Sequence, residues 1–257
     1  MNEAFITLLS SENYLDGALV LHESYKEHNS KYPFVIAVTE NVATPKVISA
    51  IKKSGAILEI IPNCSYNTFV KDRWKGNSVL NTASKYSLFD LKQYDKLVYI
   101  DADTYVITDI SCLMDYPDGA MIFNPDYKTI GGDKYGFTGA YVFKPKNHES
   151  SFYKILNENL NMVDGELIGK MWFFVMDSPS HQIPISYCCG YGWWECNKEV
   201  PVNILHFSGE NKPWLIQFSE TNNHIRNYYR LLKKIQRYKK SFSWKPLSNL
   251  FTFKKEI

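Results

Sequence analysis

Short apolar runs alternate with helical segments through the first hundred residues. Four runs are predicted as strands: Ala4–Leu9, Phe34–Thr39, Ile57–Ile61 and Leu97–Ile100, of which the first and the last have the content of buried strands. The helix expected after the first run has an apolar face of residues three and four apart, namely Tyr14, Ala18, Leu21 and Tyr25. Further helices are expected over Pro45–Lys53 and from about Val79 to Leu91. This alternation predicts an α/β domain with a mostly parallel central sheet flanked by helices.

The pattern changes after residue 103, where the apolar runs become shorter. Strands are expected over Ala120–Phe123, Phe137–Phe143 and Val202–Phe207, and a helix is expected over His148–Leu160. Gly139 interrupts the second of these strands. A glycine there indicates either a bulge or the close approach of a ligand or another backbone segment.

The C-terminal residues differ in composition, so we expect a main domain over residues 1–222 and a basic, aromatic, helical tail over 223–257. From about His224, apolar residues follow helical spacing among lysines and arginines: Tyr228, Leu231, Leu232, Ile235 and Tyr238. Such a helix either lies peripherally on an anionic membrane surface or packs against the domain with its lysines in solvent. Packing is the preferred interpretation up to Tyr238.

The bulk composition restricts the class of protein. The 257 residues, 45% of them hydrophobic, are enough for one large core. A net charge of +2 from 29 basic and 27 acidic side chains argues against nucleic acid as a partner. The five cysteines, with Cys188 and Cys189 adjacent, form no disulfide or metal-binding pattern. No window reaches about 18 uninterrupted apolar residues, and Glu3 does not suit a signal peptide. These features predict a cytoplasmic protein, soluble or peripheral to a membrane, with reduced thiols.

The fourth apolar run ends in two aspartates, Asp101 and Asp103, separated by Ala102. Residues two apart lie on the same face of a strand, so an extended chain would direct both carboxylates the same way. Neighbouring carboxylates repel each other unless a cation neutralises them, and ligands bind at the carboxyl ends of strands in open α/β sheets. The alternative interpretation is that Asp101 is a polar strand end and Asp103 opens a turn.

A second polar cluster follows the last predicted strand and contains His206 and the Lys212–Trp214 segment. Two carboxylates and one neutral imidazole form a mixed oxygen and nitrogen site that suits Mn²⁺ or Mg²⁺ and leaves positions for substrate oxygens. A protonated lysine binds phosphate as a point charge. The two aspartates, His206 and Lys212 together predict a site that holds a diphosphate leaving group.

Several motifs occur in the order found in one enzyme family. They are Ala4–Leu8, Gly17–Leu21, Lys85, Asp101–Thr104, Thr138–Val142, His206–Gly209 and Lys212–Trp214. In these motifs the chain resembles the glycogenin-like members of retaining glycosyltransferase family 8. The resemblance covers roughly Ala4 to Trp214 and implies a single domain of the nucleotide-diphospho-sugar transferase (GT-A) fold.

The resemblance implies a role for each matching residue. The metal ligands are expected to be Asp101, Asp103 and His206, which would hold Mn²⁺ or Mg²⁺ against the phosphates of a UDP-sugar. The start of the family's nucleotide site corresponds to Leu8, Ser10 and Tyr14, where backbone groups read the uracil and the tyrosine packs on its ring. The ribose would contact Ala102, and the diphosphate would contact Gly209 and Lys212.

The donor sugar is expected beside a further set of residues. In the family, the sugar lies near positions that correspond to Lys85, Asp126, Thr138 and Gly139. Phe137 replaces an amide residue common in the family, so the hexose is left open between glucose and galactose. Either Asp164 or Glu166 is expected near the reacting carbon. The implied acceptor is a hydroxyl of a glycan or a protein, and a second copy of the chain is a candidate partner.

Two other functions are compatible with parts of the pattern. A phosphotransferase of the haloacid-dehalogenase type also has an Asp-x-Asp after a strand, but it needs Thr or Val where this chain has Tyr105, and its motif usually lies near the N-terminus. A non-catalytic protein that binds sugar nucleotides would keep the same fold.

The chemistry expected of a family 8 transferase is transfer of the hexose with retention of configuration. The transfer would proceed by front-face attack assisted by the leaving phosphate or through a covalent intermediate.

Overall fold

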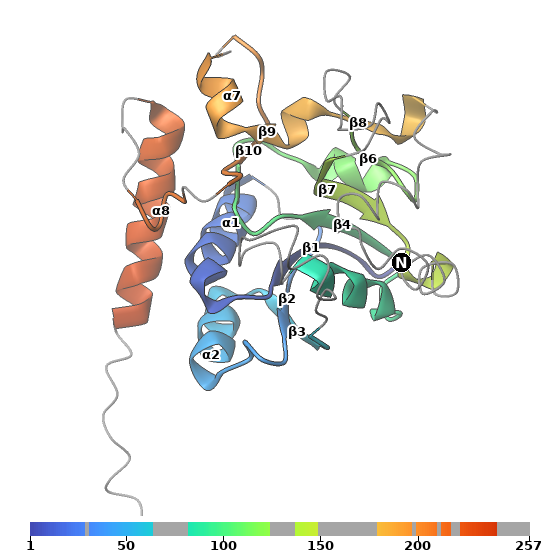
Figure 1. Cartoon of the computed structure of the whole chain (residues 1–257), viewed down its shortest axis with the longest axis horizontal. Coiled ribbons are helices and arrows are strands. Elements are labelled where there is room, and N and C mark those ends of the chain that lie inside the picture. The colour runs from blue at the N-terminus through green and yellow to red at the C-terminus, as the bar shows by residue number, and fades with distance from the viewer. Residues whose placement is uncertain are drawn as a thin grey trace, which may run out of the picture.

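A computed structural model describes residues 1–28, 31–63, 82–123, 137–148, 179–196, 199–209, 212–216 and 222–240. The helix predicted over His148–Leu160 lies almost wholly outside these residues. Figure 1 shows a central sheet with α1 and α2 on one side and α8 beyond α1. Among the described residues, no helix is both long enough and apolar enough to cross a lipid bilayer.

Within the described residues, the central sheet has seven strands in the order β3-β2-β1-β4-β7-β6-β8. Their bounds are β1 Glu3–Leu9, β2 Phe34–Thr39, β3 Ile57–Ile61, β4 Lys96–Ile100, β6 Met121–Phe123, β7 Phe137–Phe143 and β8 Gln182–Pro184. The first four strands run parallel, while β7 is antiparallel to both β4 and β6. The predicted parallel sheet is confirmed, and its strands in the first hundred residues lie within one residue of the predicted bounds.

Two long helices cover one face of this sheet. They are α1 (Leu15–His28) and α2 (Pro45–Ser54). Thr44 caps the start of α2, and its hydroxyl accepts a hydrogen bond from the backbone amide of Val47. On the strands, alternate residues point toward these helices, because side chains alternate between the two faces of a sheet. The helices therefore close a core against one face and leave the carboxyl strand ends at its edge.

The segment before β4 differs from the prediction. It forms a 3₁₀ helix, η2 (Thr82–Asp90), instead of an α-helix. Residues 84–89 are all buried, so this segment has no polar face to direct toward solvent. Amphipathic periodicity, which favours an α-helix at a protein surface, is therefore absent here.

A second, three-stranded sheet lies beyond the carboxyl end of β4. It consists of β5 (Thr104–Val106), β10 (Ile204–His206) and β9 (Cys189–Gly190). β10 runs antiparallel to β5, which places His206 opposite Thr104, and parallel to β9. The sequence pattern did not predict this sheet, although it placed β10 within two residues. The small sheet joins residues about a hundred positions apart.

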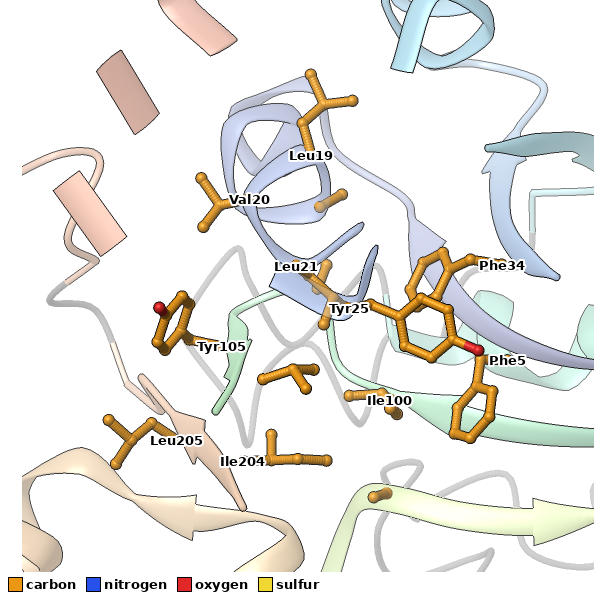
Figure 2. Close-up of a cluster of buried hydrophobic side chains, with 14 of the residues drawn as sticks. Phe5, Leu19, Val20, Leu21, Tyr25, Phe34, Ile100, Tyr105, Ile204 and Leu205 are labelled. Carbon is orange, nitrogen blue, oxygen red and sulfur yellow. The ribbon is translucent and has the colours of Figure 1, made fainter. Parts of the chain in front are cut away.

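The core is continuous from the large sheet to the small one. In Figure 2, Phe5, Tyr25 and Phe34 lie together between α1 and the first strands, and each pair involving Tyr25 has ring centroids 5.0 Å apart. Tyr105 and Leu205 lie on the side of the small sheet. Since α1 packs on both β1 and β5, it fixes the two sheets relative to each other.

The C-terminal helix α8 (Asn223–Lys240) packs against α1. Its apolar stripe is buried: Ile225, Tyr228, Leu231, Leu232 and Ile235. This agrees with the preferred interpretation of the tail, and the same stripe is not available to a membrane surface. The remaining short elements are η1 Glu12–Tyr14, η3 Ser111–Asp115, η4 Pro145–Asn147, η5 Pro179–His181, η6 Ile185–Tyr187 and α7 Tyr191–Cys196.

Candidate metal centre

The two aspartates lie where the chain leaves β4. The backbone amide of Asp101 donates a hydrogen bond to the carbonyl of Gly139 at 2.9 Å, and the hydroxyl of Thr104 donates to the carbonyl of Asp101 at 2.7 Å. Ala102 and Asp103 form a turn before β5 begins, as in the alternative interpretation, so the chain is not extended through Asp103. Turn geometry, not strand alternation, therefore directs the two carboxylates into one site.

The small sheet brings His206 to this turn. The backbone amide of Phe207 donates to the carbonyl of Asp103 at 2.9 Å. The Nε2 atom of His206 lies 3.2 Å from Oδ1 of Asp103 and 3.8 Å from Oδ2 of Asp101. One donor atom from each of the three side chains falls within 4.8 Å of the others. The structure thus places together the three residues that the sequence predicted as metal ligands.

The donor set fits a divalent cation. The side chains are largely buried, with 19% of Asp101, 12% of Asp103 and 6% of His206 exposed. Two carboxylates and one imidazole supply fewer ligands than six-coordinate Mn²⁺ or Mg²⁺ requires, so oxygens of a substrate or of water would complete the shell. The partly exposed Asp101 lies on the open side of the cluster.

Charges within the cluster are strongly coupled. Burial alone would raise the pKa of Asp103, but His206 and then Lys212 hold it well below the usual carboxyl range. Burial alone would lower the pKa of His206, but Asp103 raises it well above its ordinary value. Each group thus stabilises the charged form of its neighbour, as expected for a closely packed set of opposite charges.

Two buried lysines contact the aspartates. Nζ of Lys212 lies 2.5 Å from Oδ2 of Asp103 and donates to the carbonyl of Phe207 at 2.7 Å. Nζ of Lys85, which comes from η2, lies 3.0 Å from Oδ1 of Asp101. Both lysines predicted beside the site are therefore within it, and each is paired with a different carboxylate.

Tyr99 is a member of the site that the sequence analysis missed. Its hydroxyl donates a hydrogen bond to Oδ1 of Asp101 at 2.6 Å, and Nζ of Lys85 lies 5.0 Å from the centre of its ring. Two donors on Oδ1 leave Oδ2 as the atom of Asp101 that faces His206. Strand alternation could have identified it, because side chains two residues apart lie on the same face of a strand, and Tyr99 is two residues before Asp101.

Tyr14 and Trp214 form a wall beside the aspartates. Their rings meet edge to face at 5.5 Å, and Nζ of Lys212 lies 5.4 Å from the centre of the Tyr14 ring. Burial raises the pKa of Tyr14 to about 12, with further contributions from Asp103 and Asp101. Trp214 is anchored by its indole N–H, which donates to the carbonyl of Asn13 at 2.8 Å.

Some of the other predicted residues lie in the described part of the chain and some lie outside it. Leu8 and Ser10 lie at the carboxyl end of β1, and Ala102 is buried between the two aspartates. Gly209 follows β10 and has a φ of +85°. Thr138 and Gly139 belong to β7, beside β4. Three predicted residues lie outside the described part of the chain: Asp126, Asp164 and Glu166.

Cys188 is a second residue that the sequence analysis did not assign to the site. Its sulfur lies 3.6 Å from Nδ1 of His206, on the side of the imidazole away from the aspartates, and its residue is 1% exposed. Burial raises the pKa of this thiol above its ordinary value, although the nearby His206 opposes the shift. No spacing rule pointed to this contact, because it depends on the pairing of β9 with β10.

A separate cavity of about 980 Å³ lies between α1, α2 and α8. Its two carboxylates are already held by lysines: Glu12 by Lys46, and Glu23 by Lys26 and Lys234. None of the three predicted metal ligands lines this cavity. The chemistry of the Asp101 cluster, and not cavity size, therefore identifies the candidate site.

Comparisons with known proteins agree with this geometry. A family model described as glycosyl transferase family 8 matches residues 5–131. Human glycogenin-2 is 23% identical over 232 residues, which are 85% of this chain and 44% of that protein. Rabbit (Oryctolagus cuniculus) glycogenin-1 is 25% identical over 88% of this chain and 69% of its own length. The chain thus spans about half to two thirds of these relatives.

Solved structures show the same fold. An active-site mutant of LgtC has a TM-score of 0.61 and 16% identity, covering 90% of this chain and 95% of its own. The bifunctional glycosyltransferase WbbM also has a TM-score of 0.61 and 16% identity, covering 91% of this chain and 51% of its own. The family match over residues 5–131, the glycogenin relatives and this fold support a glycogenin-like glycosyltransferase with the GT-A fold, similar to the members of glycosyl transferase family 8.

Proposed function

We propose that the chain transfers a hexose, glucose or galactose, from a UDP-sugar to a hydroxyl of a glycan or protein acceptor, with retention of configuration. The observation that carries this proposal is the convergence of Asp101, Asp103 and His206 within 4.8 Å, with Lys212 beside them. The match to family 8 and the glycogenin relatives support sugar transfer, while the identity of donor and acceptor belongs to the proposal.

The cation site would hold Mn²⁺, with Mg²⁺ as the alternative. Its ligands would be Oδ2 of Asp101, a carboxylate oxygen of Asp103 and Nε2 of His206. When bound, the cation supplies positive charge to the diphosphate and so stabilises the departing UDP. The imidazole favours Mn²⁺ over Mg²⁺, because Mg²⁺ prefers oxygen ligands.

Lys212 would carry a second positive charge to the diphosphate. It comes from the turn after β10 and contacts the same aspartate as His206. Charge on the leaving group grows as the glycosidic bond breaks, so this ammonium stabilises the transition state more than the bound substrate. Gly209, with its positive φ and no side chain, would allow the phosphates to approach the backbone closely.

The nucleotide would lie along the wall formed by Tyr14. Its ring is beside both aspartates, a position suited to packing on uracil, with backbone groups of Leu8 and Ser10 reading the base edge. Ala102, between the two ligands, would contact the ribose. A larger side chain at residue 102 would compete with the sugar for this space.

The donor sugar would lie between η2 and β7, near Lys85, Thr138 and Gly139. Lys85 holds Oδ1 of Asp101 and so orients the carboxylate whose other oxygen faces the cation. Asp126 near the sugar, and Asp164 or Glu166 near the reacting carbon, stay predictions. We favour front-face attack by the acceptor, assisted by the leaving phosphate, over a covalent intermediate.

The cell compartment is also part of the proposal. The described cysteines, Cys112, Cys188, Cys189 and Cys196, are free thiols. Free thiols support a reducing environment, because extracellular compartments favour disulfides. We therefore propose that the protein acts in the cytoplasm.

The test is metal-dependent release of UDP from a panel of UDP-sugars, with and without sugar acceptors. We expect release with Mn²⁺, slower release with Mg²⁺ and none after chelation. Asp103→Ala should lower the rate by at least about 100-fold, since it removes a ligand and the partner of Lys212. Glu40→Ala, a change at an exposed carboxylate distant in sequence from the cluster, is the matched control.

Two results would contradict the proposal in different ways. Tight binding of a UDP-sugar without release under any metal condition would indicate the non-catalytic alternative. Release that is unaffected by chelation and by Asp103→Ala would show that the cluster does not hold a catalytic cation.

A further inference from the structure

A buried thiol contacts the imidazole of the candidate metal ligand. Sγ of Cys188 lies 3.6 Å from Nδ1 of His206, a hydrogen-bond distance for sulfur, while Nε2 of the same ring faces Asp103 at 3.2 Å. The ring thus has one nitrogen toward the carboxylates and the other toward the thiol.

The two ring nitrogens have different tasks in a metal site. A neutral imidazole binds a cation only through the nitrogen that carries no proton, so Nε2 is free to ligate when the proton is on Nδ1. Metal-binding histidines generally donate that second N–H to an acceptor, which fixes the protonated nitrogen and the ring orientation. Here the acceptor in position is a cysteine sulfur.

The fold holds this sulfur in place. The backbone amide of Cys188 donates to the carbonyl of Ile185 at 2.9 Å, and the next residue, Cys189, pairs with Leu205 in the small sheet. The neighbouring thiol of Cys189 contacts the carbonyl of Gly190 at 3.9 Å. Two adjacent buried cysteines therefore have different surroundings, and one of them contacts the imidazole.

We propose that Cys188 is a positioning residue: its sulfur accepts the Nδ1–H of His206 and thereby keeps Nε2 turned toward the two aspartates, where that nitrogen can ligate a cation once it has given up its own proton. This inference rests on the cation site of the proposed function, and it concerns a residue outside the ligand set. Cys188 touches neither cation nor substrate and acts through the orientation of the imidazole.

The first measurement is the affinity for Mn²⁺ by calorimetry in the absence of nucleotide. Cys188→Ala should weaken binding roughly tenfold or more, the loss typical of removing a second-shell partner of a histidine ligand. Cys188→Ser should recover part of the affinity, because a hydroxyl oxygen also accepts the N–H. Cys189→Ala, which removes an equally buried thiol without contact to the ring, should bind Mn²⁺ like the parent.

The second measurement reports the proton on the ring directly. Long-range ¹H–¹⁵N spectra of the Mg²⁺-loaded protein, with His206→Asn to assign the signal, should show the proton of His206 on Nδ1. In Cys188→Ala this signature should weaken or shift while the melting temperature stays close to that of Cys189→Ala.

The outcomes separate this inference from the proposed function. A parent protein that does not bind Mn²⁺ overturns both. A parent that binds Mn²⁺ while Cys188→Ala retains its affinity and its Nδ1 signature overturns only the role of Cys188. Equal losses in the alanine variants of Cys188 and Cys189 also overturn it, because they indicate a general effect of core truncation.

Discussion

Gly17 determines how closely α1 approaches the turn that carries the aspartates. A Cβ at this position would lie 2.6 Å from Cη2 of Trp214 and 2.8 Å from the carbonyl oxygen of Ala102. Neither neighbour is the flexible end of a long side chain, so the space is closed by a ring and a backbone atom. A single missing methyl group therefore allows the wall of the site to form.

Gly17→Ala is expected to destabilise the protein by about 1–3 kcal/mol, the usual cost of forcing an extra methyl into a packed interior. It should also weaken UDP binding, because Trp214 packs against Tyr14. Urea denaturation and calorimetry measure the two effects. Gly192→Ala is the control, since a Cβ there meets no atom within 4 Å. Parent-like stability and UDP affinity in Gly17→Ala would contradict the packing described.

His22 is a buried titratable residue outside the site. Its Nδ1 lies 3.1 Å from the hydroxyl of Ser54, and its ring lies 5.3 Å from that of Phe34. Burial, followed by Lys26, lowers the pKa of His22 to about 4. The folded state therefore resists protonation at pH values where an unfolded histidine, with a pKa of about 6.5, accepts a proton.

The sign of the resulting pH dependence follows from linkage. The contribution of neutral His22 to the free energy of unfolding is fully present above pH about 6.5. It is lost as the pH falls toward 4, and the total loss is up to about 3 kcal/mol. His22→Gln should therefore show a flatter decline in unfolding free energy between pH 7 and pH 4 than the parent. Exposed His28→Gln on the same helix is the control, and an unchanged slope in His22→Gln would refute the assignment.

At the scale of elements, the small sheet and α8 position the late part of the site. Phe207 connects both sides, because its amide donates to Asp103 and its carbonyl accepts from Lys212. The Phe207 ring packs edge to face on Tyr228 of α8, with centroids 5.3 Å apart. The helix α8 thus supports the residues that follow β10, although none of its described side chains belongs to the cation cluster.

Tyr228 and Tyr25 give a matched pair of hydroxyl deletions. Among the described residues, the buried hydroxyl of Tyr228 has no hydrogen-bond partner, whereas that of Tyr25 donates to the carbonyl of Tyr32 at 2.8 Å. Tyr228→Phe should be neutral or stabilising, because it removes a buried polar group without breaking a bond, while Tyr25→Phe should cost about 1 kcal/mol. Chemical denaturation checks both values. A larger loss in Tyr228→Phe than in Tyr25→Phe would contradict the environment described for α8.

At the scale of the whole molecule, the sequence predicted the parts of the fold that have long, regular patterns. β1, β2 and β4 are buried runs of five to seven residues, and β3 is a five-residue apolar run with Ile57 and Ile60 exposed, so the positions of all four were predictable from the sequence. β5, β9 and β10 have two or three residues each, too few for any periodicity, and their pairing depends on the tertiary structure. Residues 84–89 of the 3₁₀ helix η2 are all buried, polar ones included, so this segment does not show the amphipathic pattern of a surface helix.

The sequence motifs predicted the residues whose side chains form the centre of the site. Asp101, Asp103, His206 and Lys212 were identified from residue types and their order, and the structure brings them together. The supporting contacts were not predictable. Gly17 was noted only as part of a motif and Cys188 only for its cysteine neighbour, and the role of each depends on which segments the fold places against it.

The proposed cation site joins residues about a hundred positions apart. Calorimetric titration with Mn²⁺ of the parent, Asp103→Ala, His206→Ala and the Glu40→Ala control tests this most directly. We predict one Mn²⁺ per chain in the parent and control, and at least about a 100-fold loss of affinity in each ligand variant. Parent-like Mn²⁺ binding by His206→Ala would contradict the account, because the imidazole would then lie outside the cation site.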